Sequence, residues 1–493
     1  MKVPLRHYPG MNKLVLDWLE GDERFLRRTS FGVRRQIRRL PGADFVAALQ
    51  DSNKQWGLFV GNALKQWATG ETLTIIAGQQ VGFAGGPLYT LAKIASLIRF
   101  KRDMEKQGIP VTAFFWLATE DHDFDEVATL NVPVPNRQLD LLCIRAVRTA
   151  DSRSVVGPLP VPEELVTQLL ALYDTPRPAW LRPGISFRDS FAELIASVFG
   201  SEIILIDSLL PELRRAGAPL FDKIDASKDA IQRVLRDRAE ELEAAGYREQ
   251  VIPGDDNEYS LLFEIDGHGH RRAPTAKRQP ERTSTSALTR PMLQDFVFQP
   301  DIFVGGPAEV AYYAQISALH DLLGVPMPRV ALRGHALVAP KRVVRALERF
   351  QIDPAEVFTS PDRILSKREP EGVSRIRELT HDAKRDLFRR IEQIGELALP
   401  ADHSLAGSIQ RSIGHLEYHF DKLAQRAIKG LVRKDRERFA VVRELVATLY
   451  PDGQVQDRIV SWFAFWHRHG DYLVERVIEE IEPDSAYFKI VSL

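Results

Sequence analysis

Two apolar runs of strand length, separated by a helical pattern, constrain the fold of this chain most strongly. The runs are residues 73–77 (LTIIA) and 111–119 (VTAFFWLAT), and residues 87–107 carry the spacing of an amphipathic helix. The second run is apolar on both faces, which is typical of a strand that helices cover on both sides. A strand, a helix and a parallel strand form a right-handed βαβ unit. The pattern therefore predicts an α/β fold with a parallel sheet.

Further strand patterns extend this sheet, at residues 202–207, 302–304 and 329–332. Their alternation with helices favours a doubly wound sheet. Residues 130–180 and 245–290 interrupt the alternation and are predicted insertions, the second with an exposed loop or hairpin at 267–282. The first seventy residues are predicted to be helical, at 14–19, in the basic stretch 27–39 and at 45–67.

Near residue 371 the apolar spacing changes to steps of three and four. One series runs through residues 376–394 and another through 409–427, with the break LPADHS between them. Such spacing places an apolar seam along each helix and predicts two long antiparallel helices. Pairing between two chains, pairing within one chain and an ordinary helical subdomain remain alternatives. The predicted division is a core at 1–370, these helices at 371–450, and a segment at 451–493 that returns to the core.

Composition excludes several classes of partner and site. The 66 basic and 67 acidic residues nearly cancel, so net charge gives no reason to expect nucleic acid or an anionic membrane. No segment resembles a signal peptide or reaches the length of a membrane span. Cys143 is the single cysteine, which excludes an intrachain disulfide and fits a reducing cytoplasm. It lies in the apolar run 141–144, which predicts a buried, inert thiol.

A glycine-rich turn follows the first strand, in the segment AGQQVGFAGGPLYTLAK at 77–93. Its glycines, at 78, 82, 85 and 86, allow positive φ and close approach to a ligand, and Pro87 suits the first position of a helix. Free N–H groups at such a helix start favour an anion, and Gln79 and Gln80 add uncharged donors and acceptors. The segment is neither a Walker loop nor G-x-G-x-x-G. Ligand binding and simple turn geometry both fit it.

An acidic cluster, EDHDFDE at 120–126, follows the second strand directly. Because the carboxyl ends of parallel strands share one edge of a sheet, we expect this cluster to face the glycine-rich turn across a common hollow. Asp121, His122 and Asp123 could bind an ammonium group, hold Mg²⁺ or act as acid and base. A solvated surface run of acids is the alternative.

A third strand runs into a similar elbow in DIFVGGPAEVAYYAQI, residues 301–316. Gly305, Gly306 and Pro307 form the elbow. Glu309 falls in the first helical turn, where a carboxylate also simply favours the helix dipole. Tyr312 and Tyr313 suit either a pocket wall or the core. Two Gly-Gly-Pro elbows on one sheet strengthen the prediction of a single ligand cleft.

Together these segments resemble the bacillithiol biosynthesis cysteine-adding enzymes. The resemblance rests on residues 78–94, 114–127, 303–316, 324–333 and 456–465, in the family's order over nearly the whole chain. Asp457 departs from the family pattern, where Glu is expected, and residues 257–272 fit only loosely. The resemblance implies a Rossmann-like core similar to class I synthetases and nucleotidyltransferases, with connecting insertions and a C-terminal coiled coil that pairs two subunits into a homodimer.

The resemblance also implies a reaction. The expected enzyme is a ligase that joins the carboxyl of L-cysteine to the amine of glucosamine–malate and forms bacillithiol. Activation of the carboxyl by ATP is expected from the synthetase-like fold, with Mg²⁺ as a further possibility and no dedicated metal site. A different ATP-dependent adenylating or nucleotidyl-transferring enzyme is one alternative. A non-enzymatic, nucleotide-binding dimeric scaffold is another.

Site roles follow from the same resemblance. The catalytic group comprises His122 as the base for the attacking ammonium, Asp123 as a contact to the cysteine amine, Asp121 beside them, and Lys93 stabilising negative charge. The nucleotide- or substrate-binding group comprises Gln79, Gln80, Gly82, Gly85, Gly86, Tyr89, Glu120, Asp125, Gly305, Gly306, Glu309 and Tyr312. Replacing His122 or Asp123 with Ala is expected to abolish product while leaving the fold intact.

Overall fold

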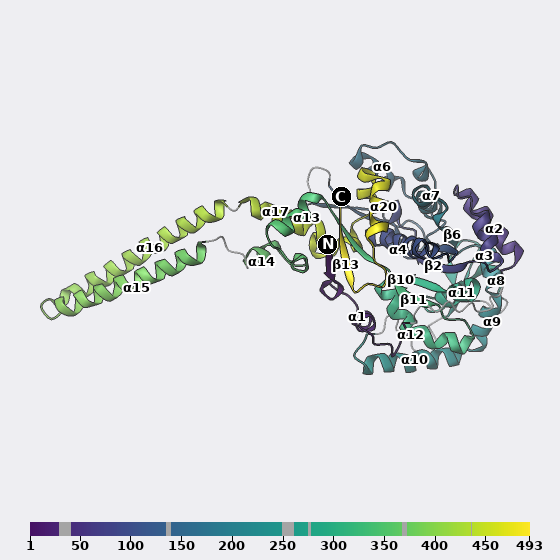
Figure 1. Cartoon of the computed structure of the whole chain (residues 1–493), viewed down its shortest axis with the longest axis horizontal. Coiled ribbons are helices and arrows are strands. Elements are labelled where there is room, and N and C mark those ends of the chain that lie inside the picture. Colours follow the sequence, from purple (N-terminus) through teal and green to yellow (C-terminus); the bar gives the residue numbers. More distant parts are fainter. Residues whose placement is uncertain (29–40, 135–139, 249–260, 275–277, 367–371, 435) are drawn as a thin grey trace. The chain divides into compact units, whose positions relative to one another are not determined.

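A computed structural model describes the chain except for residues 29–40, 135–139, 249–260, 275–277, 367–371 and 435 (Figure 1). The chain divides into two compact units. The first comprises Met1–Pro340 and Gln454–Leu493, and the second comprises Lys341–Gly453. The sequence pattern placed the division near 370 and 450. The second unit begins earlier because the short helix α13 (Lys341–Arg349) packs on α17 (Arg436–Leu449), and this helix is too short to show the three-four spacing.

A five-stranded parallel sheet forms the centre of the first unit, which confirms the predicted α/β class. Its strands are β2 (Leu73–Gln79), β3 (Val111–Leu117), β6 (Ile204–Asp207), β10 (Ile302–Gly305) and β11 (Arg329–Leu332). Their spatial order is β11-β10-β2-β3-β6, with every neighbouring pair parallel. The chain thus builds outward from β2 to β6 and then returns to the other side of β2 with β10. The chain leaves β2 toward β3 on one side, whereas β10 lies on its other side, so the strand order reverses between β2 and β10. Open parallel α/β sheets bind their ligands at such a switch point.

Side chains on both faces of β3 are buried, as the apolar run predicts. Phe114 packs on one face, with ring centroids 4.9 Å from Trp67 and 5.1 Å from Phe298. Phe115 packs on the other face, 6.5 Å from Phe191. These partners belong to α3 (Gly61–Ala68), α11 (Arg290–Phe298) and α7 (Phe187–Phe199). The crossover helix α4 (Leu88–Glu105) packs against β2 and β3, which completes the βαβ unit.

Smaller sheets surround this core. One joins the two ends of the chain, in the order β1 (Lys2–Pro4), β13 (Tyr487–Ser492) and β12 (His335–Ala339). The insertions supply the hairpin β4 (Thr129–Pro133) and β5 (Leu141–Arg145), and a sheet of β8 (Arg271–Arg272), β7 (Leu262–Ile265) and β9 (Thr283–Thr285). β7 and β8 form the hairpin expected near 267–282.

The prediction that Cys143 is buried is wrong. Cys143 is exposed, whereas its neighbour Ile144 is fully buried. The two-stranded ribbon β4–β5 has one covered face, and alternate side chains of a strand point to opposite faces. An apolar run therefore does not require that every member be buried.

The other helices of the first unit pack on its sheets or on one another. They are α1 (Lys13–Leu19), α2 (Ala43–Gln55), α5 (Phe124–Val127), α6 (Glu163–Tyr173), α8 (Pro211–Ala216), α9 (Ala218–Ala226), α10 (Lys228–Ala244), α12 (Pro307–Leu323), α18 (Gln456–Ile459), α19 (Phe463–His469) and α20 (Asp471–Glu480). The predicted helix at 45–67 is two helices, α2 and α3. The basic stretch 27–39 lies outside the described residues from residue 29 onward, as do parts of the 245–290 insertion.

The second unit contains the two predicted long helices, α15 (Val373–Ala398) and α16 (Ala406–Lys434). They pack side by side as an antiparallel hairpin (Figure 1). Lys384 Nζ lies 2.6 Å from Asp421 Oδ1 across the pair. α14 (Pro361–Ser366) packs on α17 in the same unit. Within the described residues, no helix is long and apolar enough to span a bilayer.

Candidate active site

A pocket of about 820 Å³ opens at the carboxyl ends of β2, β3, β10 and β11, where the sheet order changes direction. One wall comes from the segments after these strands: Gly78, Gln79, Gln80, Ala118, Glu120, Asp121, His122, Gly306, Pro307, Ala308, Glu309 and Arg333. Tyr89, Lys93, Glu126 and Arg458 complete this wall, and the 245–290 insertion contributes Phe263, Arg271, Thr285, Ser286, Ala287 and Arg290. The glycine-rich turn and the acidic cluster therefore share one cavity.

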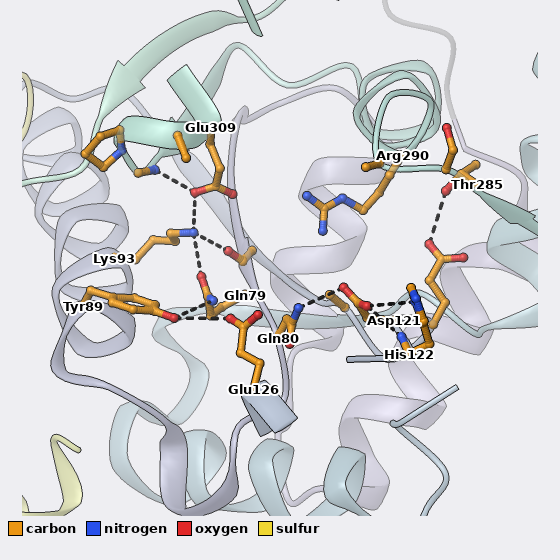
Figure 2. A pocket seen from close by; sticks show the side chains of 18 of the residues that line it. Gln79, Gln80, Tyr89, Lys93, Asp121, His122, Glu126, Thr285, Arg290 and Glu309 are labelled. Carbon is orange, nitrogen blue, oxygen red and sulfur yellow. Dashed lines mark hydrogen bonds and ion pairs between the residues drawn. The ribbon is translucent and has the colours of Figure 1, made fainter. Parts of the chain in front are cut away.

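Gln80 and Asp121 join the two predicted segments directly (Figure 2). Gln80 Nε2 donates to Asp121 Oδ2 at 2.9 Å. The other oxygen of Asp121 accepts the backbone N–H groups of His122 at 2.7 Å and Asp123 at 3.2 Å. Burial opposes ionisation of Asp121, but the hydrogen bond of the His122 side chain, those of the two backbone N–H groups and the charge of Arg290 lower its pKa to about 2. Asp121 is consequently an anion at neutral pH and a weak base.

Lys93 lines the pocket, but its side chain is almost fully buried and its ammonium group makes three hydrogen bonds. Its Nζ donates to Gly78 O at 2.7 Å, Gln79 Oε1 at 2.9 Å and Glu309 Oε2 at 2.5 Å. Glu309 Oε2 also accepts the N–H of Gly306 at 2.7 Å. Burial lowers the pKa of Lys93, and Glu309 opposes that shift. An ammonium group has three N–H donors, so this arrangement favours a structural role for Lys93 over contact with a substrate.

Glu126 is the carboxylate of this wall whose pKa is raised. Loss of hydration is the largest cause, and the charges of Asp123 and Asp121 add to it. Glu126 Oε1 accepts from Tyr89 OH at 3.4 Å, and Gln79 Nε2 donates to the same hydroxyl at 3.4 Å. Burial keeps Tyr89 protonated by raising its pKa. Asp121 and Glu126 therefore differ in proton affinity, which is the pattern of an anion and a base in one site.

Glu120 lines the pocket but serves mainly to connect strand β3 to the insertion. Its Oε2 lies 3.0 Å from Arg214 Nη2 and accepts from Ser284 Oγ at 2.7 Å. Thr285 Oγ1 donates to its second oxygen at 3.3 Å. Both carboxylate oxygens are thus satisfied by buried partners, so Glu120 holds the insertion wall in place.

Several predicted site residues do not line the pocket: Gly82, Gly85, Gly86, Asp123, Asp125, Gly305 and Tyr312. A Cβ on Gly85 would lie 2.3 Å from Trp462 Nε1, so packing requires this glycine. Asp123 caps α5 by accepting the Glu126 N–H at 3.0 Å, and Asp125 pairs with Arg145 at 2.7 Å. His122 does line the pocket, at its rim, with 59% of its side chain exposed.

The pocket is also lined by four charged residues for which the sequence motifs alone predict no role: Glu126, Arg290, Arg333 and Arg458. Glu126 was inside the acidic cluster, and Arg333 and Arg458 lie in the segments that carry the family resemblance. Arg333 Nη2 lies 3.3 Å from Asp457 Oδ2, and Tyr8 OH donates to Asp457 Oδ1 at 2.5 Å. Asp457 thus contacts Arg333 from outside the pocket. Arg290 belongs to the insertion, where no pattern pointed to a site.

The described residues contain no group of three or more His, Cys, Asp or Glu side chains arranged to hold a metal ion. Of the acidic cluster, the carboxylates of Glu120, Asp121 and Glu126 line the pocket.

Comparisons with known proteins match the chain to two family models and to several relatives. Residues 19–273 and 270–334 match the family model for the bacillithiol biosynthesis BshC N-terminal Rossmann-like domain. Residues 336–493 match the model for the BshC C-terminal coiled-coil domain. A protein of Solibacter usitatus is 28% identical over 91% of this chain and 89% of its own length. A protein of Koribacter versatilis is 30% identical over 82% of this chain and 81% of its own length. Both carry the name "Putative cysteine ligase BshC".

Proposed function

The chain belongs to the bacillithiol biosynthesis BshC family, and from this premise we propose that it is a cysteine ligase. The proposed reaction joins the carboxyl group of L-cysteine to the amine of glucosamine–malate through an amide bond. Both relatives described above carry the name of a cysteine ligase, which supports this class of reaction for the chain.

One observation supports this chemistry most: Asp121 and Glu126 lie on the same pocket wall with pKa values shifted in opposite directions. Asp121, which stays ionised, suits an ammonium group. Glu126, which gains proton affinity, suits a general base. A reaction between an amine and a carboxyl derivative requires both functions, since a protonated amine cannot attack.

In the proposed step, the acceptor nitrogen attacks the activated carboxyl carbon of cysteine and forms the C–N bond. The activating group leaves with the electron pair of the C–O bond that breaks. Glu126 takes the proton that the nitrogen releases. Gln79 and Gln80 orient polar groups of the substrates, because their amides face the pocket without adding charge.

ATP is the proposed source of the activating group, and it would supply a carboxyl derivative reactive toward amines. Gly306 and Pro307 begin the 17-residue helix α12 at the pocket, and helix starts favour anions. Arg333 and Arg458 line the same cavity and would add positive charge toward phosphates. Mg²⁺ would accompany the nucleotide through phosphate oxygens and water.

We further propose that the protein is cytoplasmic and forms a homodimer through α15 and α16. Leu379, Ile394 and Leu423 belong to the predicted seams, yet they are 52%, 60% and 65% exposed in the single chain. A second copy of the hairpin would cover such side chains.

The purified full chain, supplied with L-cysteine, glucosamine–malate and ATP, tests the proposal directly. Mass spectrometry should detect the amide product, and release of AMP and pyrophosphate would identify adenylation. Product with another acceptor would favour a related adenylating enzyme. Nucleotide binding without any turnover would favour the scaffold and overturn the ligase proposal.

A further inference from the structure

Arg290 lines the pocket, and none of the described carboxylates forms an ion pair with its guanidinium. Lys93 is paired with Glu309, and Arg333 with Asp457. Arg271 and Arg458 have no ion pair among the described residues either, but each lies over an aromatic ring, of Phe263 and Tyr8. Among the described residues, the guanidinium of Arg290 makes one hydrogen bond, from Nη2 to Tyr312 OH at 3.4 Å.

Glu309 and Asp121, the carboxylates whose charges act on Arg290, accept hydrogen bonds from other donors. Glu309 Oε2 accepts from Lys93 and from the Gly306 N–H, and Asp121 accepts from Gln80 and two backbone N–H groups. Burial lowers the pKa of Arg290, but Tyr312, Glu309 and Asp121 together raise it, so the guanidinium stays charged. These two carboxylates stabilise the charge of Arg290, but neither accepts a hydrogen bond from its guanidinium among the described residues.

The backbone holds Arg290 firmly in this place. It is the first residue of α11, and its N–H donates to Ser286 O at 2.9 Å. The preceding Thr289 donates through Oγ1 to Leu261 O at 2.6 Å, and it accepts the Ser286 N–H at 3.0 Å. Tyr312, which anchors one end of the guanidinium, is stacked on Tyr313 at 5.5 Å. Figure 2 shows the side chain reaching from α11 into the cavity.

We propose that Arg290 binds a substrate carboxylate in this pocket through its Nε and Nη1 donors, which have no acceptor in the part of the chain that the structure describes. A guanidinium presents parallel N–H groups that match the two oxygens of a carboxylate. The inference rests on the proposed function, in which both substrates carry this group: the α-carboxylate of L-cysteine and the carboxylates of the malyl unit. Arg290 would then set which end of the substrate enters the insertion side of the pocket.

Calorimetric titration of the full chain with four ligands tests the inference and separates the two sources. L-Cysteine is compared with cysteamine, which lacks the carboxylate, and glucosamine–malate is compared with glucosamine. The Arg290→Gln variant should weaken binding of one carboxylate ligand about tenfold or more, and leave its carboxylate-free counterpart unchanged. Arg290→Lys should recover part of the loss.

Arg272→Gln is the matched control, because Arg272 belongs to the same insertion but is exposed and paired with Asp266. It should bind all ligands normally. Equal weakening of a ligand and its carboxylate-free counterpart, unchanged binding of both carboxylates, or no carboxylate binding by the wild type would each overturn the inference. Amide formation by the wild type is measured separately, so a carboxylate site that depends on Arg290 in a chain without ligase activity would refute the proposed function alone.

Discussion

Lys93 Nζ lies 2.5 Å from Glu309 Oε2, and this ion pair joins the segments that follow β2 and β10 at the switch point of the sheet. Only 3% of the Lys93 side chain is exposed, against 19% for Glu309. Gly78 O and Gln79 Oε1 take the remaining Lys93 donors, so the two Gly-rich elbows are held together by one ammonium group.

Breaking this pair should destabilise the fold. Glu309→Gln leaves a buried ammonium without its counter-charge, which typically costs about 3–5 kcal/mol. Urea unfolding followed by circular dichroism measures the loss of unfolding free energy. Lys93→Met combined with Glu309→Leu should lose less than Glu309→Gln, because no buried charge remains unpaired. A loss below about 1 kcal/mol for Glu309→Gln would show that the pair is not structural.

Glu126→Gln should abolish the acidic limb of the pH–rate profile for amide formation. The base must be ionised, so wild-type activity should rise as pH rises through the raised pKa of Glu126. The variant should be slower by about 10²–10⁴-fold. An unchanged rate and profile would remove Glu126 from the proton transfer.

The same substitution should slightly stabilise the fold at neutral pH. A carboxyl whose folded pKa is raised favours folding below its unfolded pKa, and this contribution disappears as pH rises through the folded pKa. Glu126→Gln removes the unfavourable anion, so its advantage in thermal stability should be present at pH 7 and vanish at pH 4. Greater instability of the variant at pH 7 would contradict this sign.

Asp121 and Asp123 should behave differently when each is changed to Asn. Asp121 faces the pocket as an anion, so Asp121→Asn should raise the KM for the amine substrate about tenfold or more. Asp123 points to the α5 cap, and Asn is an equally good cap residue, so Asp123→Asn should retain most activity. His122→Ala in the same assay tests the role predicted for that imidazole, and near-normal turnover would remove it from the mechanism.

Cys143 should react with a thiol reagent in the native protein. It is the single cysteine, is exposed on β5 and is not one of the residues that line the pocket. Stoichiometric labelling without denaturant, with no change in amide formation, is the expected result. Cys143→Ser is the control for labelling. Protection of the thiol until the protein unfolds would contradict its exposed position.

Charged substitutions in the apolar seams of α15 and α16 should disrupt the proposed homodimer. Leu379→Glu and Leu423→Glu place charges on exposed seam positions of α15 and α16, and they should convert a dimer to monomers in sedimentation analysis. Glu417→Gln, at a partly exposed position of α16 outside the seam, is the control. A wild-type chain that sediments as a monomer at micromolar concentration would refute the homodimer.

The amino-acid sequence determined the parallel sheet, the two elbows and the long helices, because each depends on local periodicity. Apolar residues at strand and helix spacing decide which face is buried, and parallel strands bring the ends of 73–79, 111–117 and 302–305 to one edge. Gln80 and Asp121 could therefore be expected to meet from sequence alone.

Tertiary structure decided which polar side chains face the cavity. Lys93 donates to Glu309, which is 216 positions away in the sequence. The Asp123 side chain caps α5 and does not line the cavity. Arg290 reaches the pocket from an insertion whose sequence carries no site pattern. These outcomes depend on contacts between segments distant in the chain, and a hydrogen bond goes to whichever partner folding brings within reach. Local periodicity encodes burial, whereas the direction of a polar side chain follows from the assembled fold.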